Sequence, residues 1–187
     1  MGSADQAVMV ALTEKITGLT YPTTLIGTDG YVQFLDSSAA GGFSAENAVF
    51  IGFDREDGDI VRSTQTYAGL GGMAKNETVI VNCAVSCFVG GSADTDGELL
   101  DDSDAQNSAK QNAYAILAVI ENAIVDDKQL LLVADPPVNP TTNTNLILWS
   151  ELSESGCIGG AAKSGGAIGR SADITFSFTA HCRLYFS

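Results

Sequence analysis

The stretch Asp173-Ile-Thr-Phe-Ser-Phe-Thr-Ala-His-Cys-Arg-Leu-Tyr-Phe186 alternates between two kinds of side chain along its whole length. The even-numbered positions, from Ile174 to Phe186, are apolar, and the odd-numbered positions, from Asp173 to Tyr185, point to the opposite face and are mostly polar. A period of two is typical of a β-strand that is covered on one face only. We therefore predict a long strand here, with its even-numbered side chains in the core.

Three further stretches predict strands of the same sheet. Residues 78–89 also alternate, with Val79, Val81, Cys83, Val85, Cys87 and Val89 on one face. Residues 48–53 form a short apolar run between the turn dipeptides Asp29-Gly30 and Asp57-Gly58, which is typical of a buried strand. Residues 146–152 are a second apolar run, and we expect another strand there.

Two stretches carry apolar side chains at helical spacing. In residues 4–18 the apolar stripe is Ala7, Val8, Ala11, Leu12 and Ile16, and Gly18 marks the expected end. The second helix is expected to begin at Ser103, whose spacing from Gln106 fits a capping box, and to end near Asp126. Its apolar stripe is Ala109, Ala113, Ile116, Leu117, Ile120 and Ile124.

The order of these elements is a helix, several strands, a helix and two strands, without a regular β-α alternation. This order favours the α+β class, in which an antiparallel β-sheet has the two main helices packed on one face and ends in a long C-terminal strand. A chain of 187 residues fits a single domain, 1–187.

The length of the last strand bears on function. Its 14 residues, 173–186, reach roughly 46 Å at about 3.3 Å each. A compact domain of this size is only about 40 Å wide. We therefore expect this strand to bend, to break at a bulge, or to run past its own domain and pair with a neighbouring subunit.

The composition excludes several classes of protein. Nine basic and 23 acidic residues give a net charge of −14, which excludes the basic surface of a nucleic-acid-binding protein and disfavours docking on anionic lipid. No stretch is long and apolar enough for a transmembrane helix, and the first residues lack the pattern of a secretion signal. Four cysteines in a chain of this length do not indicate a disulfide scaffold, so we expect synthesis in a reducing cytosol.

The groups that carry catalysis or bind metals are few. His181 is the only histidine, and it is expected on the polar face of the last strand, opposite Cys182. We therefore expect a surface or interface histidine and no catalytic residue. Cys83 and Cys87 share a face but lie roughly 13 Å apart along a strand, which is too far for a disulfide or one zinc. Together with Cys157 they are expected to be free thiols, and no metal or cofactor is expected.

Two stretches partly match known binding loops. Gly156-Cys-Ile-Gly-Gly-Ala-Ala-Lys-Ser164 is similar to a phosphate-binding loop, but it has Ala162 where the glycine before the lysine is needed, and no helix follows. We expect the whole glycine-rich stretch from Ser155 to Arg170 to be a mobile loop. The acidic stretch from Asp94 to Asp104 lacks the ligand ladder of a calcium loop and is expected to be a solvated entry to the second helix.

The ordered set of these elements resembles the tail terminator proteins of long-tailed bacteriophages. The resemblance rests on the first helix, the strands from Tyr67 to Val89, and the alanine-rich helix Asn107-Ser-Ala-Lys-Gln-Asn-Ala-Tyr-Ala-Ile-Leu-Ala-Val-Ile-Glu-Asn-Ala-Ile124. It continues through Trp149-Ser-Glu-Leu152, the glycine-rich stretch and the closing strand. It covers about two thirds of the chain, and loop insertions near 20–44 and 134–145 lie outside the pattern.

The resemblance implies a structural protein of the virion, without enzymatic activity. Such a protein would form a hexameric ring at the head-proximal end of the viral tail, end tube polymerisation and take part in head-tail joining. The partners it implies are the tail tube protein, a head-tail connector or head-closure protein, and genomic DNA that passes without specific binding. It would be assembled in the host cytoplasm, without a membrane.

Two alternatives stay open. One is another tail or connector component, such as a tube subunit or a head-closure protein. The other is a small host hydrolase or ligand-binding domain, which would need a deep polar pocket. Replacing His181 in such a domain would remove an activity.

Overall fold

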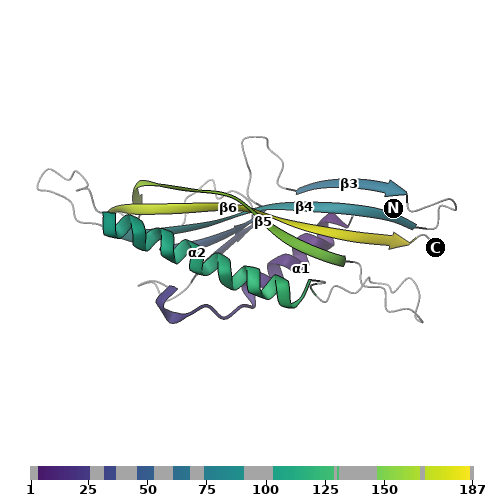
Figure 1. Cartoon of the computed structure of the whole chain (residues 1–187), viewed down its shortest axis with the longest axis horizontal. Coiled ribbons are helices and arrows are strands. Elements are labelled where there is room, and N and C mark those ends of the chain that lie inside the picture. The colour runs from purple at the N-terminus through teal and green to yellow at the C-terminus, as the bar shows by residue number, and fades with distance from the viewer. Residues whose placement is uncertain are drawn as a thin grey trace, which may run out of the picture.

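The computed structural model describes residues 4–25, 32–36, 46–52, 61–67, 74–90, 103–128, 130, 147–164 and 167–185. These residues form an α+β fold, as predicted (Figure 1). The helices are α1 (Asp5–Thr17), the short 3₁₀ helix η1 (Thr23–Leu25) and α2 (Ser103–Asp126). The strands are β1 (Gln33–Asp36), β2 (Asn47–Ile51), β3 (Val61–Tyr67), β4 (Ala74–Gly90), β5 (Ile147–Ser164) and β6 (Ala167–Tyr185).

The strands that the structure describes form a six-stranded sheet with the order β1-β2-β4-β6-β5. The remaining strand, β3, pairs with the part of β4 that β2 does not cover. Every pair is antiparallel except β1 with β2, which is parallel. Strand β4 is long enough to pair with two short strands in succession, β3 along residues 75–81 and β2 along residues 83–87. The sheet therefore has two halves, which share β4, β6 and β5.

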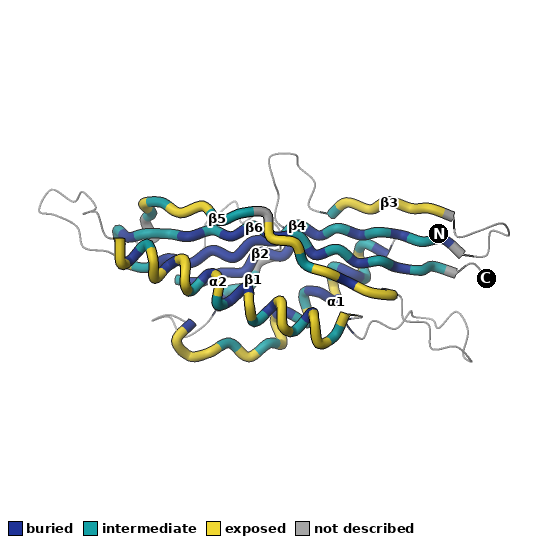
Figure 2. Tube along the Cα trace, viewed as in Figure 1, coloured by how far each residue is buried: buried dark blue, intermediate teal, exposed yellow. Residues whose placement is uncertain are grey.

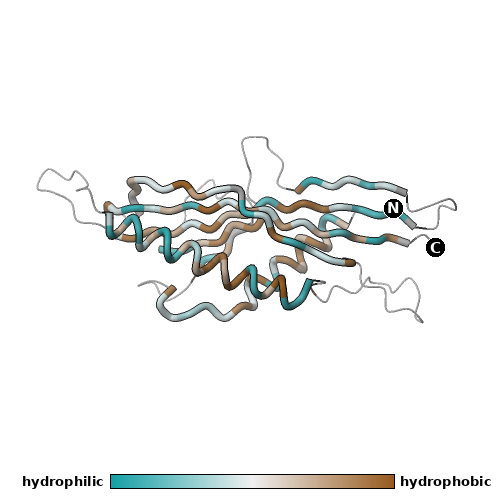
Figure 3. Tube along the Cα trace, viewed as in Figure 1, coloured by the Kyte–Doolittle hydropathy of each residue, from teal (hydrophilic) through white to brown (hydrophobic). Residues whose placement is uncertain are grey.

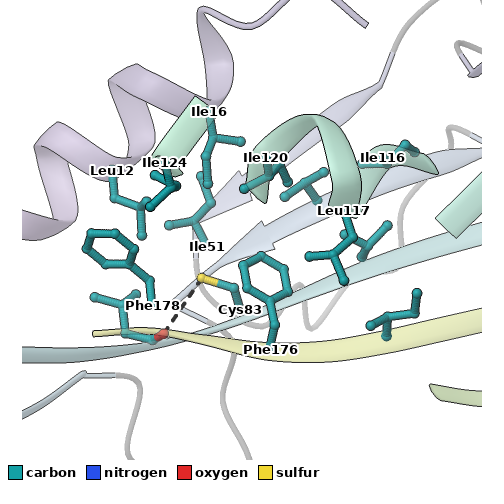
Figure 4. Packing of buried hydrophobic residues seen from close by; sticks show 14 of the residues in the cluster. Leu12, Ile16, Ile51, Cys83, Ile116, Leu117, Ile120, Ile124, Phe176 and Phe178 are labelled. Atoms are coloured by element: carbon teal, nitrogen blue, oxygen red, sulfur yellow. Dashed lines mark hydrogen bonds between the residues drawn. The ribbon is translucent and has the colours of Figure 1, made fainter. Parts of the chain in front are cut away.

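Both helices pack on the same face of the sheet, as predicted. Helix α1 contacts β2, β3 and β4, and α2 contacts β4, β5 and β6. Leu12 and Ile16 of α1 lie beside Ile120 and Ile124 of α2, above Phe178 of β6 (Figure 4). The apolar stripes of both helices were identified correctly, and the even-numbered residues of β6 from Ala172 to Cys182 are all buried.

The last strand was expected to be longer than the domain is wide, and this expectation is not met. Strand β6 has 19 residues, pairs with β4 in continuous register and has no extra residue in its pairing with β5, so it neither breaks at a bulge nor runs past its domain. The register shifts lie on β5. The expectation was wrong because it assumed a compact shape, whereas the molecule is elongated along its strands (Figure 1). As a central strand, β6 is also not available to a neighbouring subunit.

The glycine-rich stretch is not a mobile loop. Residues 156–164 extend β5, and residues 167–170 begin β6, so the two strands form one long hairpin. Pairing with β6 satisfies the backbone of this stretch and outweighs the low strand propensity of glycine. The Gln106 amide packs against Gly159, where a Cβ atom would require this side chain to move. Residues 156–164 therefore form a strand and not the loop that a phosphate-binding motif would require.

The predicted capping box is also wrong. Ser103 is the first helical residue, and the Gln106 side chain donates to the Ser171 carbonyl in β6 at 2.9 Å instead of folding back on its own helix. Other predictions lie outside the described residues: the dipeptides Asp29-Gly30 and Asp57-Gly58, the acidic residues 94–102 and the insertion at 134–145. The insertion at 20–44 is described only at residues 20–25 and 32–36.

Candidate interaction edges

One half of the sheet carries two outer edges that no described strand covers. This half, called the β3 half below, comprises β3 together with residues 74–81 of β4, 178–185 of β6 and 147–153 of β5. Its strands run in alternating directions in the order β3-β4-β6-β5. Unpaired backbone groups at such edges are templates for pairing with another chain. We therefore regard β3 and β5 as the candidate functional surfaces.

The β5 edge is apolar. Of the six large hydrophobic side chains that are exposed among the described residues, Leu148, Trp149 and Ile158 lie on β5. Two others, Tyr114 and Val125, lie on α2, which packs beside β5, and only Val10 lies on α1. Exposed apolar residues that gather along one line mark an interaction surface more often than scattered ones do.

Two bulges shape this edge. The register of β5 against β6 shifts between Ile147 and Trp149 and again between Glu154 and Gly156, so Leu148 and Ser155 are extra residues. A bulge re-aims the side chains beside it. Ile147 accordingly faces the helices and is fully buried, whereas the neighbouring Leu148 and Trp149 are 42% and 43% exposed. The first bulge thus turns an apolar strand segment outward at the edge.

A groove lies between this edge and the end of α2. Its volume is about 320 Å³, and its lining includes Ile124 and Val125 of α2, Lys128 just after this helix, and Ser150 and Leu152 of β5. The Ser150 hydroxyl donates to the Lys128 carbonyl at 2.7 Å and holds the two walls together. Glu121 and Glu151 also line the groove. The groove is therefore lined by both apolar and charged side chains, and it lies beside the uncovered edge.

In the β3 half, the face of the sheet without helices carries several polar side chains, and His181 is one of them. The imidazole of His181 stacks on the indole of Trp149, with ring centroids 3.8 Å apart and planes 17° apart, and lies 3.3 Å from the Thr78 hydroxyl. Side chains also bond across β4 and β6 where Arg183 donates to Asn76 and Ser177 donates to Asn82, both at 3.1 Å. These pairs stabilise the sheet face, and they give His181 a structural environment.

The β3 edge is polar. Residues 62–66 are all exposed, and β3 is coloured exposed along almost its whole length in Figure 2. In Figure 3 it is hydrophilic to neutral after one apolar residue at its start, Val61. Arg62 begins a row across the polar face that continues through Ile80 and Thr179 and ends at Glu151 on β5. The same row therefore begins with a cation on one edge and ends with an anion on the other.

The remaining reactive groups are dispersed. All four cysteines are free; Cys83, Cys87 and Cys182 are buried, and Cys157 is half-buried. Burial, and to a smaller extent Asp173, raises the pKa of the Cys87 thiol to about 12, so it is inert near neutral pH. Within the part of the chain that the structure describes, no three His, Cys, Asp or Glu side chains are grouped as metal ligands require, and no helix is long and apolar enough to cross a membrane.

Sequence reasoning placed His181 on the polar face and Cys182 on the opposite one, and the structure confirms both positions. It missed β3 completely and ended β5 at residue 152. The one available signal was the pair Leu148 and Trp149, because two adjacent large apolar residues in a strand cannot both face the core without a bulge. The sequence matches no protein-family model and has no significant match among curated proteins.

Proposed function

We propose that the protein is a structural subunit that assembles head to tail into a closed ring, in which β5 of one copy pairs with β3 of the next. The observation that carries this proposal is the strand order of the β3 half. Its four strands alternate in direction, so β5 runs antiparallel to β3. A copy added in the same orientation would therefore continue the sheet with another antiparallel pair. Two different edges that fit one another form a heterologous interface, which closes into a ring when the rotation permits.

The side chains at the two edges are complementary on both faces of the sheet. On the face toward the helices, Val61 is in the same row as Leu152, so Val61 of the next copy would cover the groove beside Leu152 and Val125. On the polar face, Arg62 of the next copy would meet Glu151. Thr64 of the next copy would lie against the outer side of Trp149, because Thr64 and Trp149 end the neighbouring row. The joint would thus have an apolar contact on the helix face of the sheet and an ion pair on the polar face.

Within this proposal, the tail terminator role gives the ring its biological setting. A terminator ring would meet the tail tube at one end and the head-tail connector at the other, and it would be located in the virion at the head-proximal end of the tail. The net charge of −14 per copy supports this role, since DNA would pass through such a ring without adhering to it. The hexameric state comes from the resemblance alone.

A charge-swap experiment tests the joint. Arg62→Glu and Glu151→Arg, each measured by sedimentation velocity and native mass spectrometry, are expected to convert rings into monomers, because each variant places like charges at the joint. The double variant is expected to restore the ring, since it exchanges the two charges. A wild-type protein that stays monomeric at high concentration would overturn the ring.

A second pair of variants separates this joint from general surface effects. Val125→Lys places a charge beside the groove, whereas Val10→Lys places one on the exposed side of α1. The two valines are 65% and 51% exposed, so neither variant should unfold the protein. Only Val125→Lys is expected to weaken the ring. Long polymers in negative-stain images would instead assign the protein as a tube subunit.

A further inference from the structure

The helix face of the β3 half contains a buried polar network that the proposed ring does not use directly. Glu77 of β4 is 1% exposed, and its carboxylate accepts one bond from the Ala4 backbone N–H at 2.9 Å and another from the Gln65 amide of β3 at 3.1 Å. The carbonyl oxygen of Gln65 accepts a bond from the ammonium of Lys75, which is 7% exposed. The network therefore joins α1, β3 and β4.

Glu77 serves helix α1 as a cap supplied from another element. Ala4 is the N-cap residue of α1 and has no side chain that could cap the helix. In a capping box, a glutamate inside the helix accepts a bond from the N-cap N–H, and here Glu77 does so from β4. The negative charge also lies at the positive end of the helix dipole. The seating of α1 therefore depends on a side chain that at the same time binds β3.

Strand β3 buries little of its own surface. It pairs with β4 alone among the described strands, residues 62–66 are exposed, and the helix it contacts is α1. A strand with so little buried surface opens locally at low cost in free energy. The Gln65–Glu77 bond is the link that ties this strand to the start of α1.

We propose that Glu77 is a positioning residue that couples the docking of α1 to the placement of β3, so that β3 is held as a pairing edge only while α1 is docked. The inference rests on the proposed ring, in which β3 is one of the two joined edges. It adds a means of regulation, because any partner that displaces the start of α1 would also release the edge. Such a coupling is reciprocal, so pairing of β3 in a ring would in turn stabilise α1.

The groups that face Glu77 support a tightly coupled cluster. Apart from Ala4, Gln65 and Lys75, its neighbour across the sheet is Cys182 of β6. Burial, with an added effect of the Glu77 charge, raises the pKa of the Cys182 thiol to about 12, so this thiol stays neutral near neutral pH. Lys75 and Glu77 are thus opposite charges in one buried cluster, with Gln65 between them. Replacing either charged group therefore changes the electrostatic balance of this cluster.

Hydrogen exchange followed by mass spectrometry tests the coupling in a background that does not form rings, Arg62→Glu. In that background Glu77→Gln is expected to speed exchange at least about tenfold, both in residues 61–67 and at the start of α1, because bonds to a charged group are lost. Exchange in the β5–β6 hairpin should stay unchanged. Glu154→Gln is the control, since Glu154 lies on β5 outside the β3 half, accepts a bond from Tyr114, and should leave both segments unchanged.

A second variant keeps the test decisive if Glu77→Gln fails to fold. Gln65→Ala changes only β3, yet it is expected to speed exchange at the start of α1, which Gln65 reaches through Glu77. Acceleration confined to one of the two segments, in either variant, would overturn the coupling. The exchange results do not depend on assembly. A monomeric wild type would therefore overturn the ring, while the exchange results would still decide whether the coupling exists.

Discussion

The central strands and the outer strands of the sheet are built in different ways. Strands β4 and β6 pair on both sides and send one row of side chains into a fully buried core. Strands β3 and β5 pair on one side only; β3 is exposed along most of its length, and β5 is interrupted by two bulges. The core therefore depends on the central strands, and the outer strands keep side chains that the fold itself does not need. Those side chains are available to a partner.

The largest difference between the two regions is expected in stability. Phe176→Ala removes a fully buried ring from central β6 and should lower the free energy of unfolding by about 3–5 kcal/mol. Trp149→Ala removes a ring of similar type that is 43% exposed on outer β5, and it should cost about 1 kcal/mol through the lost stacking on His181. Urea unfolding of both variants measures the difference. Equal losses would contradict the distinction between the regions.

A matched pair of glycines gives the next largest effect. A Cβ atom at Gly169 of β6 would collide with the Val89 carbonyl and lie 2.6 Å from the Phe88 ring, so Gly169→Ala should cost about 1–3 kcal/mol. Gly160 lies nearby on β5 with open space around its Cβ position, and Gly160→Ala should change stability by less than about 0.5 kcal/mol. Thermal unfolding compares them directly. A strongly destabilised Gly160→Ala variant would show that the outer strand is packed on both sides.

Alkaline pH should lower the stability of the folded protein through two buried thiols of the central strands. Unfolded thiols ionise near 9.0, whereas the pKa of Cys87 and of Cys182 is raised to about 12 by burial in the folded protein. Between these values the unfolded chain releases protons that the folded chain retains, so stability falls as pH rises above 9. At pH 10 the loss should be on the order of 1 kcal/mol per thiol. The double variant Cys87→Ala/Cys182→Ala should flatten this dependence in denaturant titrations.

The smallest expected effect is spectroscopic. Trp149 is the only tryptophan of the chain, and it lies on the outer strand at the proposed joint. Dilution of the ring to monomers should shift its fluorescence emission slightly to the red, because the outer side of the indole becomes hydrated. The Arg62→Glu variant should show the shifted emission at every concentration. If the emission spectrum did not change on assembly, the joint would not include Trp149.

The same contrast explains what could be predicted from the sequence. The residues of β4 and β6 must satisfy a core on one face, so the alternation from Val79 to Val89 and from Ile174 to Cys182 is strong and was identified. The stripes of α1 and α2 follow from the same requirement. Strand β3 contributes few side chains to the core, and its polar sequence Arg62-Ser-Thr-Gln-Thr66 has no pattern that distinguishes a strand from a loop.

The extension of β5 could not be predicted from local propensity. Its glycines, Gly156, Gly159 and Gly160, are poor strand formers, and only pairing with β6 makes them a strand. Gln106 was assigned a local role in a capping box, whereas its amide binds Ser171, which lies 65 positions away in sequence. The shape argument failed for a related reason: strand pairing, and not compactness, determines the length of this domain. Long-range partners thus decided each of the features that the sequence did not reveal.

The even number of strands in the β3 half has a consequence for copy number. Since each subunit begins and ends this half with strands of opposite direction, identical neighbours in the proposed ring would meet antiparallel at every junction, whether the number of subunits is odd or even. The directions of the strands therefore do not determine how many subunits the ring contains. In the proposed ring the angle between adjacent subunits would do so, and the twist of the sheet and the bulge at Leu148 would both contribute to that angle. A single insertion or deletion there would be expected to change the diameter of the assembly while leaving its connectivity intact.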